Sequence, residues 1–232
     1  MLNLILDIIY PPRCPICKVL LKEKELFCKK CLSGFKRLKK PFCSICSIPF
    51  SGKGTICESC LRKRPYFDLI SAPFIYKESA KEAIHILKYQ KKISISRPIG
   101  RLFSEYAIRW WRWKKEDFLI VPVPLSKKKL KERGFNQSLI LARYISDALG
   151  IPMDYTSLRK VKETESQTYL SANQRKKNIK DAFQVMGNLR KRNILLIDDV
   201  ATTGSTLNEC AKALKKAGAE KVICLVFARS VQ

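Results

Sequence analysis

Eight of the ten cysteines lie before residue 61 and follow one spacing that occurs twice. Each repeat has the pattern C-x2-C-x10-C-x2-C, and the second begins 29 residues after the first. The eight positions are Cys14, Cys17, Cys28, Cys31, Cys43, Cys46, Cys57 and Cys60. Two C-x2-C turns supply four thiolates, which is the tetrahedral ligand set of a structural Zn²⁺. The repeat therefore predicts two structural zinc ions, each with four cysteine ligands and no open coordination position.

Disulfide bonds and an iron–sulfur cluster are the competing interpretations of this pattern. The apolar residues 1–10 lack a basic leader and a small-residue cleavage site, so they predict an amphipathic helix rather than an export signal. We therefore expect a cytoplasmic protein with reduced thiols, which favours zinc. The spacing leaves open whether each zinc takes one repeat or the two sites interleave. Residues 1–65 are predicted to form a double zinc ribbon with an N-terminal amphipathic helix.

Lysine and arginine outnumber aspartate and glutamate by 46 to 20, a formal net charge of +26. This excess favours polyanionic partners such as nucleic acid, nucleotide phosphates or an anionic membrane surface. A lysine-rich composition without any such ligand is the alternative. No stretch approaches about 18 uninterrupted apolar residues, so the sequence predicts no membrane span.

From residue 66 onward, short apolar runs alternate with segments of helical periodicity. Strands are predicted at 69–76, 118–123, 151–157, 181–185, 193–199 and 221–228. Helices are predicted at 79–89, 98–113, 136–149 and 207–217. The alternation predicts that residues 66–232 form an α/β domain, in which helices cover both faces of a parallel sheet.

The chemistry of this domain concentrates at residues 194–206, where a buried strand runs into two consecutive carboxylates, Asp198 and Asp199. Open α/β sheets bind ligands beyond the carboxyl ends of their strands, where these carboxylates fall. The small residues that follow can close backbone N–H groups and hydroxyls around an anion. They are Ala201, Thr202, Thr203, Gly204, Ser205 and Thr206. Carboxylates for sugar hydroxyls beside an anion-binding loop predict a site for a phosphorylated ribose.

This run resembles the motif with which type I phosphoribosyltransferases bind phosphoribosyl pyrophosphate (PRPP). The resemblance implies that Asp198 and Asp199 bind the ribose 2′- and 3′-hydroxyls and that Ala201 through Thr206 hold the 5′-phosphate. It also implies Mg²⁺ carried in with PRPP, held mainly by the substrate. The chain has no G-x4-G-K-[ST] motif, which argues against a nucleotide-hydrolysing P-loop.

Further motifs resemble those of ComF-type competence proteins. The segment 122–137, with Lys131 and Arg133, resembles their pyrophosphate-loop region, and the long polar stretch 159–178 resembles their mobile hood loop. The resemblance implies that Lys131 and Arg133 contact the pyrophosphate and that one of Arg159, Lys160 or Arg175 closes over it. It also implies a role in natural transformation, with single-stranded DNA handled in the cytoplasm.

Three functions are compatible with these motifs. The first is a Mg²⁺-dependent phosphoribosyltransferase whose acceptor the sequence does not name. The second is a non-catalytic module that senses PRPP and binds single-stranded DNA. In the third, the zinc ribbons recruit a DNA-translocation or recombination protein. No convincing catalytic base is evident in the sequence.

The remaining candidate side chains are expected to be structural. His85 is predicted to be half-buried in a helix, and Cys210 and Cys224 are predicted to be buried, inert thiols. Trp110 and Trp113 share a helix face and are expected to pack in the core. Trp111 is the exposed candidate for stacking on a nucleic-acid base.

Overall fold

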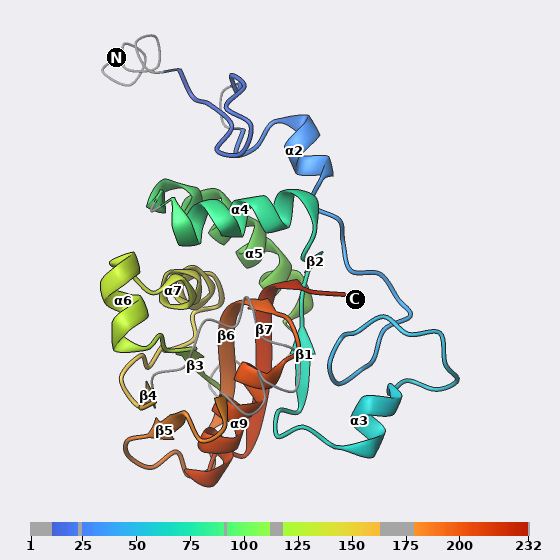
Figure 1. Ribbon diagram of the computed structural model, residues 1–232, viewed down its shortest axis with the longest axis vertical. Helices are drawn as coiled ribbons and strands as arrows, with labels where there is room; N and C mark the ends of the chain where they lie inside the picture. Colours follow the sequence, from blue (N-terminus) through green and yellow to red (C-terminus); the bar gives the residue numbers. More distant parts are fainter. Residues whose placement is uncertain (1–10, 23–24, 91, 112–117, 163–178, 232) are drawn as a thin grey trace.

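A computed structural model of the chain describes residues 11–22, 25–90, 92–111, 118–162 and 179–231. The predicted N-terminal helix, Trp113 and Arg175 lie outside the described residues, as does most of the predicted hood stretch. Figure 1 shows a central sheet (β7, β6 and β3) flanked by helices, with the N-terminal part of the chain at one end.

The central sheet is parallel throughout its described strands. Its strand order is β1–β7–β6–β3, and β2 pairs with β7 beyond the end of β1. The strands are β1 (Leu69–Ser71), β2 (Phe74–Ile75), β3 (Phe118–Pro122), β6 (Asn193–Ala201) and β7 (Lys221–Arg229). The two long central strands are buried along nearly their whole length, as expected of a parallel sheet covered on both faces.

Helices cover both faces of the sheet, as the sequence predicts. Alternate residues of β6 point to opposite sides, so Leu195 and Ile197 enter one core while Ile194 and Leu196 enter the other. The first core lies under α4 (Glu78–Tyr89), α5 (Ser96–Trp110) and α7 (Gln137–Leu149). The second lies under α9 (Ser205–Lys216). A short 3₁₀ helix, Ile93–Ile95, precedes α5.

Three of the predicted elements differ in the structure. The strand expected at 69–76 is divided into β1 and β2 around Pro73, because proline has no N–H to donate to a sheet. No strand forms at 151–157, where the pairing is a single bridge between Ile120 and Met153. The segment after Val123, expected to be a loop, contains helix α6 (Lys127–Arg133), which Ser126 caps and Gly134 ends.

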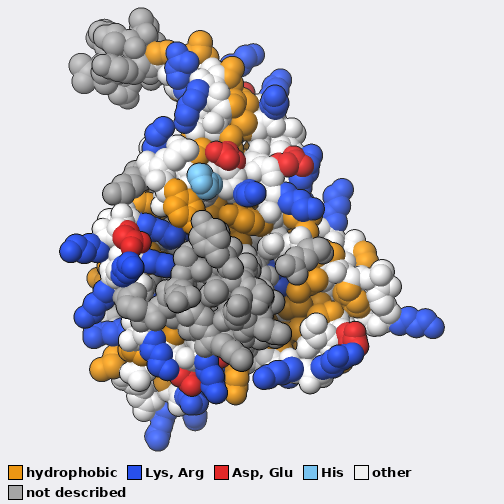
Figure 2. Space-filling view, viewed as in Figure 1, with side chains coloured by type: hydrophobic (Ala, Val, Ile, Leu, Met, Phe, Trp, Pro, Cys, Tyr) orange, Lys and Arg blue, Asp and Glu red, His pale blue; other side chains and the backbone are white. Residues whose placement is uncertain are grey.

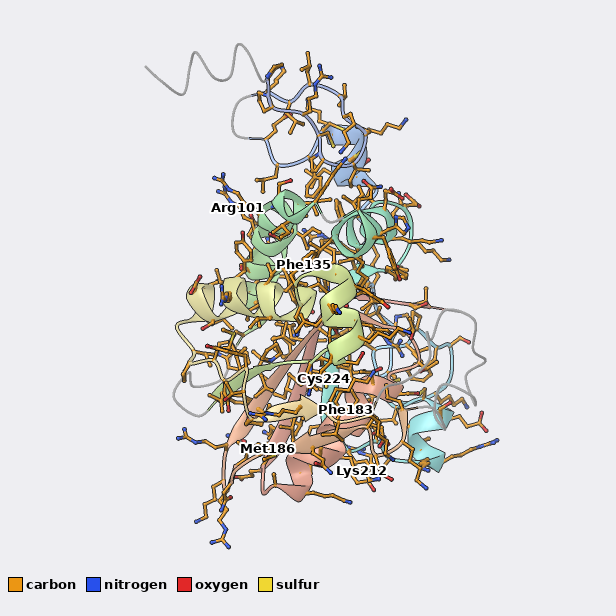
Figure 3. All side chains as sticks on the ribbon, turned by 60° about the vertical axis from the view of Figure 1, so that its left-hand side comes forward. Arg101, Phe135, Phe183, Met186, Lys212 and Cys224 are labelled. Carbon is orange, nitrogen blue, oxygen red and sulfur yellow. The ribbon has the colours of Figure 1, made fainter. Side chains whose placement is uncertain are left out.

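The strand expected at 181–185 forms as β5 (Phe183–Val185), outside the central sheet. It pairs antiparallel with β4 (Leu158–Lys160) in a separate two-stranded sheet. Figure 3 shows Phe183 on this small sheet, with Cys224 among the central strands.

The two cysteine repeats form two compact units on different parts of the domain. In the first unit (residues 14–31), helix α2 (Lys29–Ser33) follows the third cysteine, and in the second (residues 43–60) the corresponding helix is α3 (Glu58–Arg62). Cys14 and Cys31 belong to the core that contains α4, whereas all four cysteines of the second unit belong to the core that contains α9. In Figure 1, the first unit lies beyond α4 and α3 lies on the β1 side of the sheet.

Two predictions about aromatic residues are wrong. His85 is exposed and stacks on Tyr89 with ring centroids 5.0 Å apart, because it falls on the outer face of α4. Trp111 is half-buried, its ring meets Phe118 edge-on at 4.9 Å, and its indole nitrogen is shielded from solvent. Cys210 and Cys224 are fully buried as predicted, and burial raises the pKa of both thiols well above the ordinary value.

Of the helices in the described part of the chain, none has the length and apolar character that crossing a bilayer requires.

Candidate functional site

The structure resolves which cysteines share a metal site. The four sulfurs of each repeat lie within 4.8 Å of one another, so the two sites are sequential and not interleaved. All ten cysteines are free thiols, which excludes the disulfide interpretation for this structure. The Cys17 and Cys28 sulfurs are 3.5 Å apart, and those of Cys46 and Cys57 are 3.6 Å apart. Sulfurs bound at ~2.3 Å to one tetrahedral ion lie roughly 3.8 Å apart, so both sites fit structural zinc.

Backbone N–H groups already point at the sulfurs of the second site. Ile45 and Cys57 donate to the Cys43 sulfur at 3.4 and 3.3 Å. Burial opposes ionisation of Cys43, but these backbone hydrogen bonds outweigh it and lower the pKa of the thiol to about 7. Burial and the neighbouring Cys46 thiolate raise the pKa of Cys60. Four thiols lie close together here, and one of them ionises readily. A divalent cation stabilises the thiolate form of such a set and so favours its own binding.

The sequence predicts a ligand site beyond the carboxyl end of strand β6. A cleft of about 580 Å³ opens there, lined from α4, α6, α7, β6 and the loop at 201–206, hereafter the phosphate loop. The parallel register brings Pro122 of β3 opposite Ile197 of β6, so the residues just beyond both strands meet in this cleft. This is the crevice in which open α/β sheets bind their ligands.

Asp198 and Asp199 are nearly buried, at 8% and 2% exposure. Asp198 lines the cleft and accepts hydrogen bonds from the Ser138 hydroxyl at 2.7 Å and from the Asp199 backbone N–H at 2.9 Å. Asp199 lies behind it, ion-paired with Lys88 and within 3.4 Å of the Gln137 amide. At Asp199 the ion pair with Lys88 offsets the cost of burial, whereas no ion pair forms with Asp198 among the described residues.

Lys88, Gln137 and Ser138 are site residues that sequence reasoning did not name. Lys88 stands at the end of α4, and its ammonium group reaches Asp199 across more than 100 positions of sequence. Burial lowers the pKa of Lys88, but the Asp199 carboxylate outweighs that effect and raises it. Gln137 and Ser138 are buried in the first turn of α7. The only signal for them in the sequence was their position directly after Asn136, the residue that caps this helix.

The phosphate loop turns sharply into α9. Gly204 adopts φ +79°, in the left-handed region that favours glycine, and α9 begins at the next residue. The Thr203 and Ser205 hydroxyls are 2.8 Å apart, and Thr203 accepts from the Ser205 N–H at 3.3 Å. Five of the six predicted phosphate-loop residues line the cleft, whereas Thr203 does not. Small residues at the start of a twelve-residue helix form a favourable setting for an anion.

The basic residues predicted to contact pyrophosphate divide into two groups. Arg133 lines the cleft, donates to the Gln137 amide oxygen at 3.0 Å and lies 5.4 Å from the Tyr89 ring centroid. Lys160 lines it as well, near the Phe183 ring. Lys131 and Arg159 are exposed and lie outside the cleft lining, because they point away on α6 and β4. Lys129, one helical turn before Arg133, also lines the cleft, and it was not among the residues predicted from the sequence.

The buried acid pair predicts a pH-dependent stability. Burial and the Asp199 charge raise the pKa of Asp198 to about 7. A carboxyl that binds its proton more tightly when folded stabilises the protein at pH below its unfolded pKa of about 4, and this contribution is lost as pH rises through about 7. Between pH 5 and 8, Asp198 is expected to cost roughly 2–3 kcal/mol of unfolding free energy. Urea unfolding at several pH values measures this: as pH rises, the free energy of unfolding should fall more for wild type than for Asp198→Asn. Equal falls in the two proteins would contradict a raised pKa for Asp198.

Comparisons with known proteins agree with both halves of the chain. A family model described as a double zinc ribbon domain matches residues 5–61, and one described as a phosphoribosyl transferase domain matches residues 136–231. Competence protein F of Haemophilus influenzae is 35% identical over 176 residues, covering 73% of this chain and 76% of that protein. This chain belongs to the competence protein F family.

Other ComF relatives extend the comparison. DNA utilization protein YhgH of Escherichia coli (strain K12) is 33% identical over 165 residues, covering 70% of this chain and 72% of that protein. Competence protein ComFC of Bacillus subtilis is 30% identical over 146 residues, covering 62% of this chain and 57% of that protein. The ComF fold seen here is a phosphoribosyltransferase-like parallel sheet with helices on both faces, preceded by a double zinc ribbon with two four-cysteine sites.

Proposed function

We propose that this ComF protein binds PRPP in the cleft at the carboxyl edge of the sheet and single-stranded DNA on its basic surface, in the cytoplasm, during natural transformation. The observation that carries the first half is the placement of Asp198, Ser138 and the phosphate loop around one cleft. We assign the ribose hydroxyls to the acid pair, in which Asp198 faces the cleft and Asp199 lies behind it, and the 5′-phosphate to the loop. The names of the relatives, which refer to competence and DNA utilization, support the second half.

The pyrophosphate of PRPP meets cations on the opposite wall of the cleft. Arg133 and Lys129 come from α6, and Lys160 comes from the small sheet. Among the predicted pyrophosphate contacts, Arg133 and Lys160 line the cleft, which supports their role. Lys131 and Arg159 lie outside the lining and would have to turn toward the cleft to reach PRPP. Arg175 belongs to the segment outside the described residues and remains a proposed contact. Mg²⁺ carried by PRPP would neutralise the leaving group, held by substrate oxygens with few protein ligands.

The test of PRPP binding is titration calorimetry of the full-length, zinc-loaded protein with PRPP and Mg²⁺. We expect saturable binding at one PRPP per chain. Ribose 5-phosphate and pyrophosphate, titrated separately, should each bind more weakly because each fills part of the cleft. Absence of PRPP binding, or equal affinity for pyrophosphate alone, would overturn the proposal.

Turnover distinguishes an enzyme from a PRPP-sensing module. Pyrophosphate release from PRPP, Mg²⁺ and single-stranded DNA above a protein-free blank would support a phosphoribosyltransferase. Release at the blank rate would support sensing.

Single-stranded DNA has a plausible path across the basic surface. Lys and Arg side chains far outnumber acidic ones on the face shown in Figure 2. A separate groove of about 520 Å³ lies between the first zinc unit and α5, and Arg13, Arg97 and Arg101 line it beside apolar Leu21 and Leu26. Arg101 is labelled on α5 in Figure 3. Arginine guanidinium groups can both contact the phosphates of a single strand and stack on its unpaired bases.

Replacing two of these arginines is expected to reduce the salt dependence of DNA binding. Each phosphate contact with a single strand contributes about 0.7 to the slope of log affinity against log salt, so Arg97→Ala with Arg101→Ala should lower the slope by about 1.4. Fluorescence anisotropy with a labelled oligonucleotide measures it. The matched control is Arg190→Ala with Arg192→Ala, two exposed arginines just before β6. Equal slopes for wild type and the groove variant would contradict this location.

A further inference from the structure

Arg229 is a charged side chain with no exposure to solvent, and it joins two parts of the molecule that the proposed function treats separately. It is the last residue of β7. Its Nε donates to the Cys46 carbonyl of the second zinc unit at 2.9 Å. Its Nη1 donates to the Ala201 carbonyl of the phosphate loop at 2.7 Å and to the adjacent Thr202 carbonyl. One guanidinium therefore spans a metal ligand and the phosphate loop.

These contacts orient the loop backbone. In a trans peptide, the N–H points opposite to the C=O of the same unit. Because the Ala201 and Thr202 carbonyls face Arg229, the N–H groups of Thr202 and Thr203 face away from it, toward the side on which Thr202 lines the cleft. A second contact runs parallel to the first: Gly204 packs near Ile70 of β1, and Ile70 accepts and donates hydrogen bonds with Ser47 and Ile45 of the second zinc unit.

The second zinc unit also provides the negative charge that Arg229 requires. Within the described part of the chain, Arg229 forms no ion pair with a carboxylate, and its Nη2 is buried without a hydrogen-bond partner. A buried cation without a counter-charge is strongly destabilising. Four thiolates around one Zn²⁺ would carry a net charge of −2, and Arg229 already contacts this unit through the Cys46 carbonyl at 2.9 Å.

We propose that Arg229 is a positioning residue that couples the second zinc site to the phosphate loop, so that zinc at that site and PRPP in the cleft stabilise each other. This inference rests on the proposed PRPP site. Coupling between two sites is reciprocal, because each ligand shifts the affinity of the other by the same factor. Among the described residues, no hydrogen bond joins the first zinc unit to the phosphate loop, and one of its cysteines, Cys17, is exposed.

The test follows zinc release into a colorimetric chelator from the full-length protein. Release is expected in two phases, with the first site faster because Cys17 is exposed and the second slower because its four cysteines are buried. Saturating PRPP should slow the slow phase and leave the fast phase unchanged. It should also raise the equilibrium affinity of the second site for zinc by at least about fivefold, within the usual range of coupling between sites.

Arg229→Lys keeps the charge but replaces the planar fork by one nitrogen, so Cys46 and the loop carbonyls can no longer be held from two separate donors. It should retain two zinc ions, bind PRPP about tenfold more weakly and lose the protection of zinc by PRPP. The matched control is Arg62→Lys, an exposed arginine on α3 beside the same zinc site, which should behave as wild type. Raising the zinc concentration should restore neither the PRPP affinity nor the protection of zinc by PRPP, because the variant lacks the link between the sites and not the metal.

The outcomes separate the two proposals. Failure of the wild type to bind PRPP overturns the proposed function and this inference with it. Normal PRPP binding by wild type with both zinc phases unaffected overturns the coupling alone. Normal PRPP affinity and intact zinc protection in a folded Arg229→Lys variant overturn the role of Arg229. If that variant does not fold, the wild-type release experiment decides the coupling by itself.

Discussion

Replacing Asp198 and Asp199 together by alanine is expected to weaken PRPP binding by at least about 100-fold. Hydrogen bonds to charged groups contribute about 1.5–3 kcal/mol each, and this variant removes two carboxylates from a nearly buried site. It also leaves Lys88 without its ion pair, on the wall of the cleft. Calorimetric titration with PRPP and Mg²⁺ measures the loss.

Two further variants make this experiment specific. The double asparagine variant keeps the shape of the site, so the loss should persist if charge is what PRPP requires. Glu82→Ala with Asp147→Ala removes two exposed carboxylates outside the cleft lining and should leave affinity unchanged. Of the single variants, Asp198→Asn should weaken binding more than Asp199→Asn, because Asp198 faces the cleft. Wild-type affinity in the double alanine variant would remove the acid pair from the site.

Loss of the second zinc site is expected to destabilise the whole domain, more than loss of the first. Cys57→Ser with Cys60→Ser removes two ligands that are buried in the core shared with α9 and the sheet. A loss of about 5 kcal/mol, well below the binding free energy of a structural zinc, lowers the melting temperature of a chain this long by roughly 10–20 °C. Thermal unfolding by circular dichroism, with metal content measured in parallel, tests this.

The matched change at the first site is Cys28→Ser with Cys31→Ser. Because Cys17 is exposed and Cys28 is only half-buried, part of this unit can loosen without opening the sheet, and a smaller fall is expected. Metal analysis should find two zinc ions in wild type and one in each variant. A larger fall for the first-site variant, or wild-type protein with fewer than two zinc ions, would contradict this account.

Much of the candidate site could be predicted because its residues are neighbours in the chain. The cysteine ligands follow one another at short, repeated intervals, and Asp198 is followed at once by the phosphate loop. Residues this close in sequence stay close in space in any fold, so their chemistry can be predicted without the tertiary structure. The strand before Asp198 could also be predicted, because a continuous apolar run is typical of an interior parallel strand.

Other features depended on how side chains rotate on their helices. Sequence reasoning placed Lys131 and Arg133 together, but on α6 these two residues diverge and only Arg133 lines the cleft. Side chains two positions apart on a helix do not face the same way, and a segment expected to be a loop gave no basis for predicting their directions. Trp111 was misplaced for a similar reason, because the partner that covers it, Phe118, follows an intervening segment.

By itself, the sequence determined the eight candidate zinc ligands, the acid pair with the small-residue loop that follows it, and the parallel α/β class. Those properties follow from spacing and periodicity over a few residues. Only the tertiary structure decided that each zinc site uses one repeat, that Lys88 and Ser138 hold the acid pair, and that Arg229 joins the second zinc unit to the phosphate loop. Each of these depends on groups brought together from distant parts of the chain, where burial makes an unpaired charge too costly to leave alone.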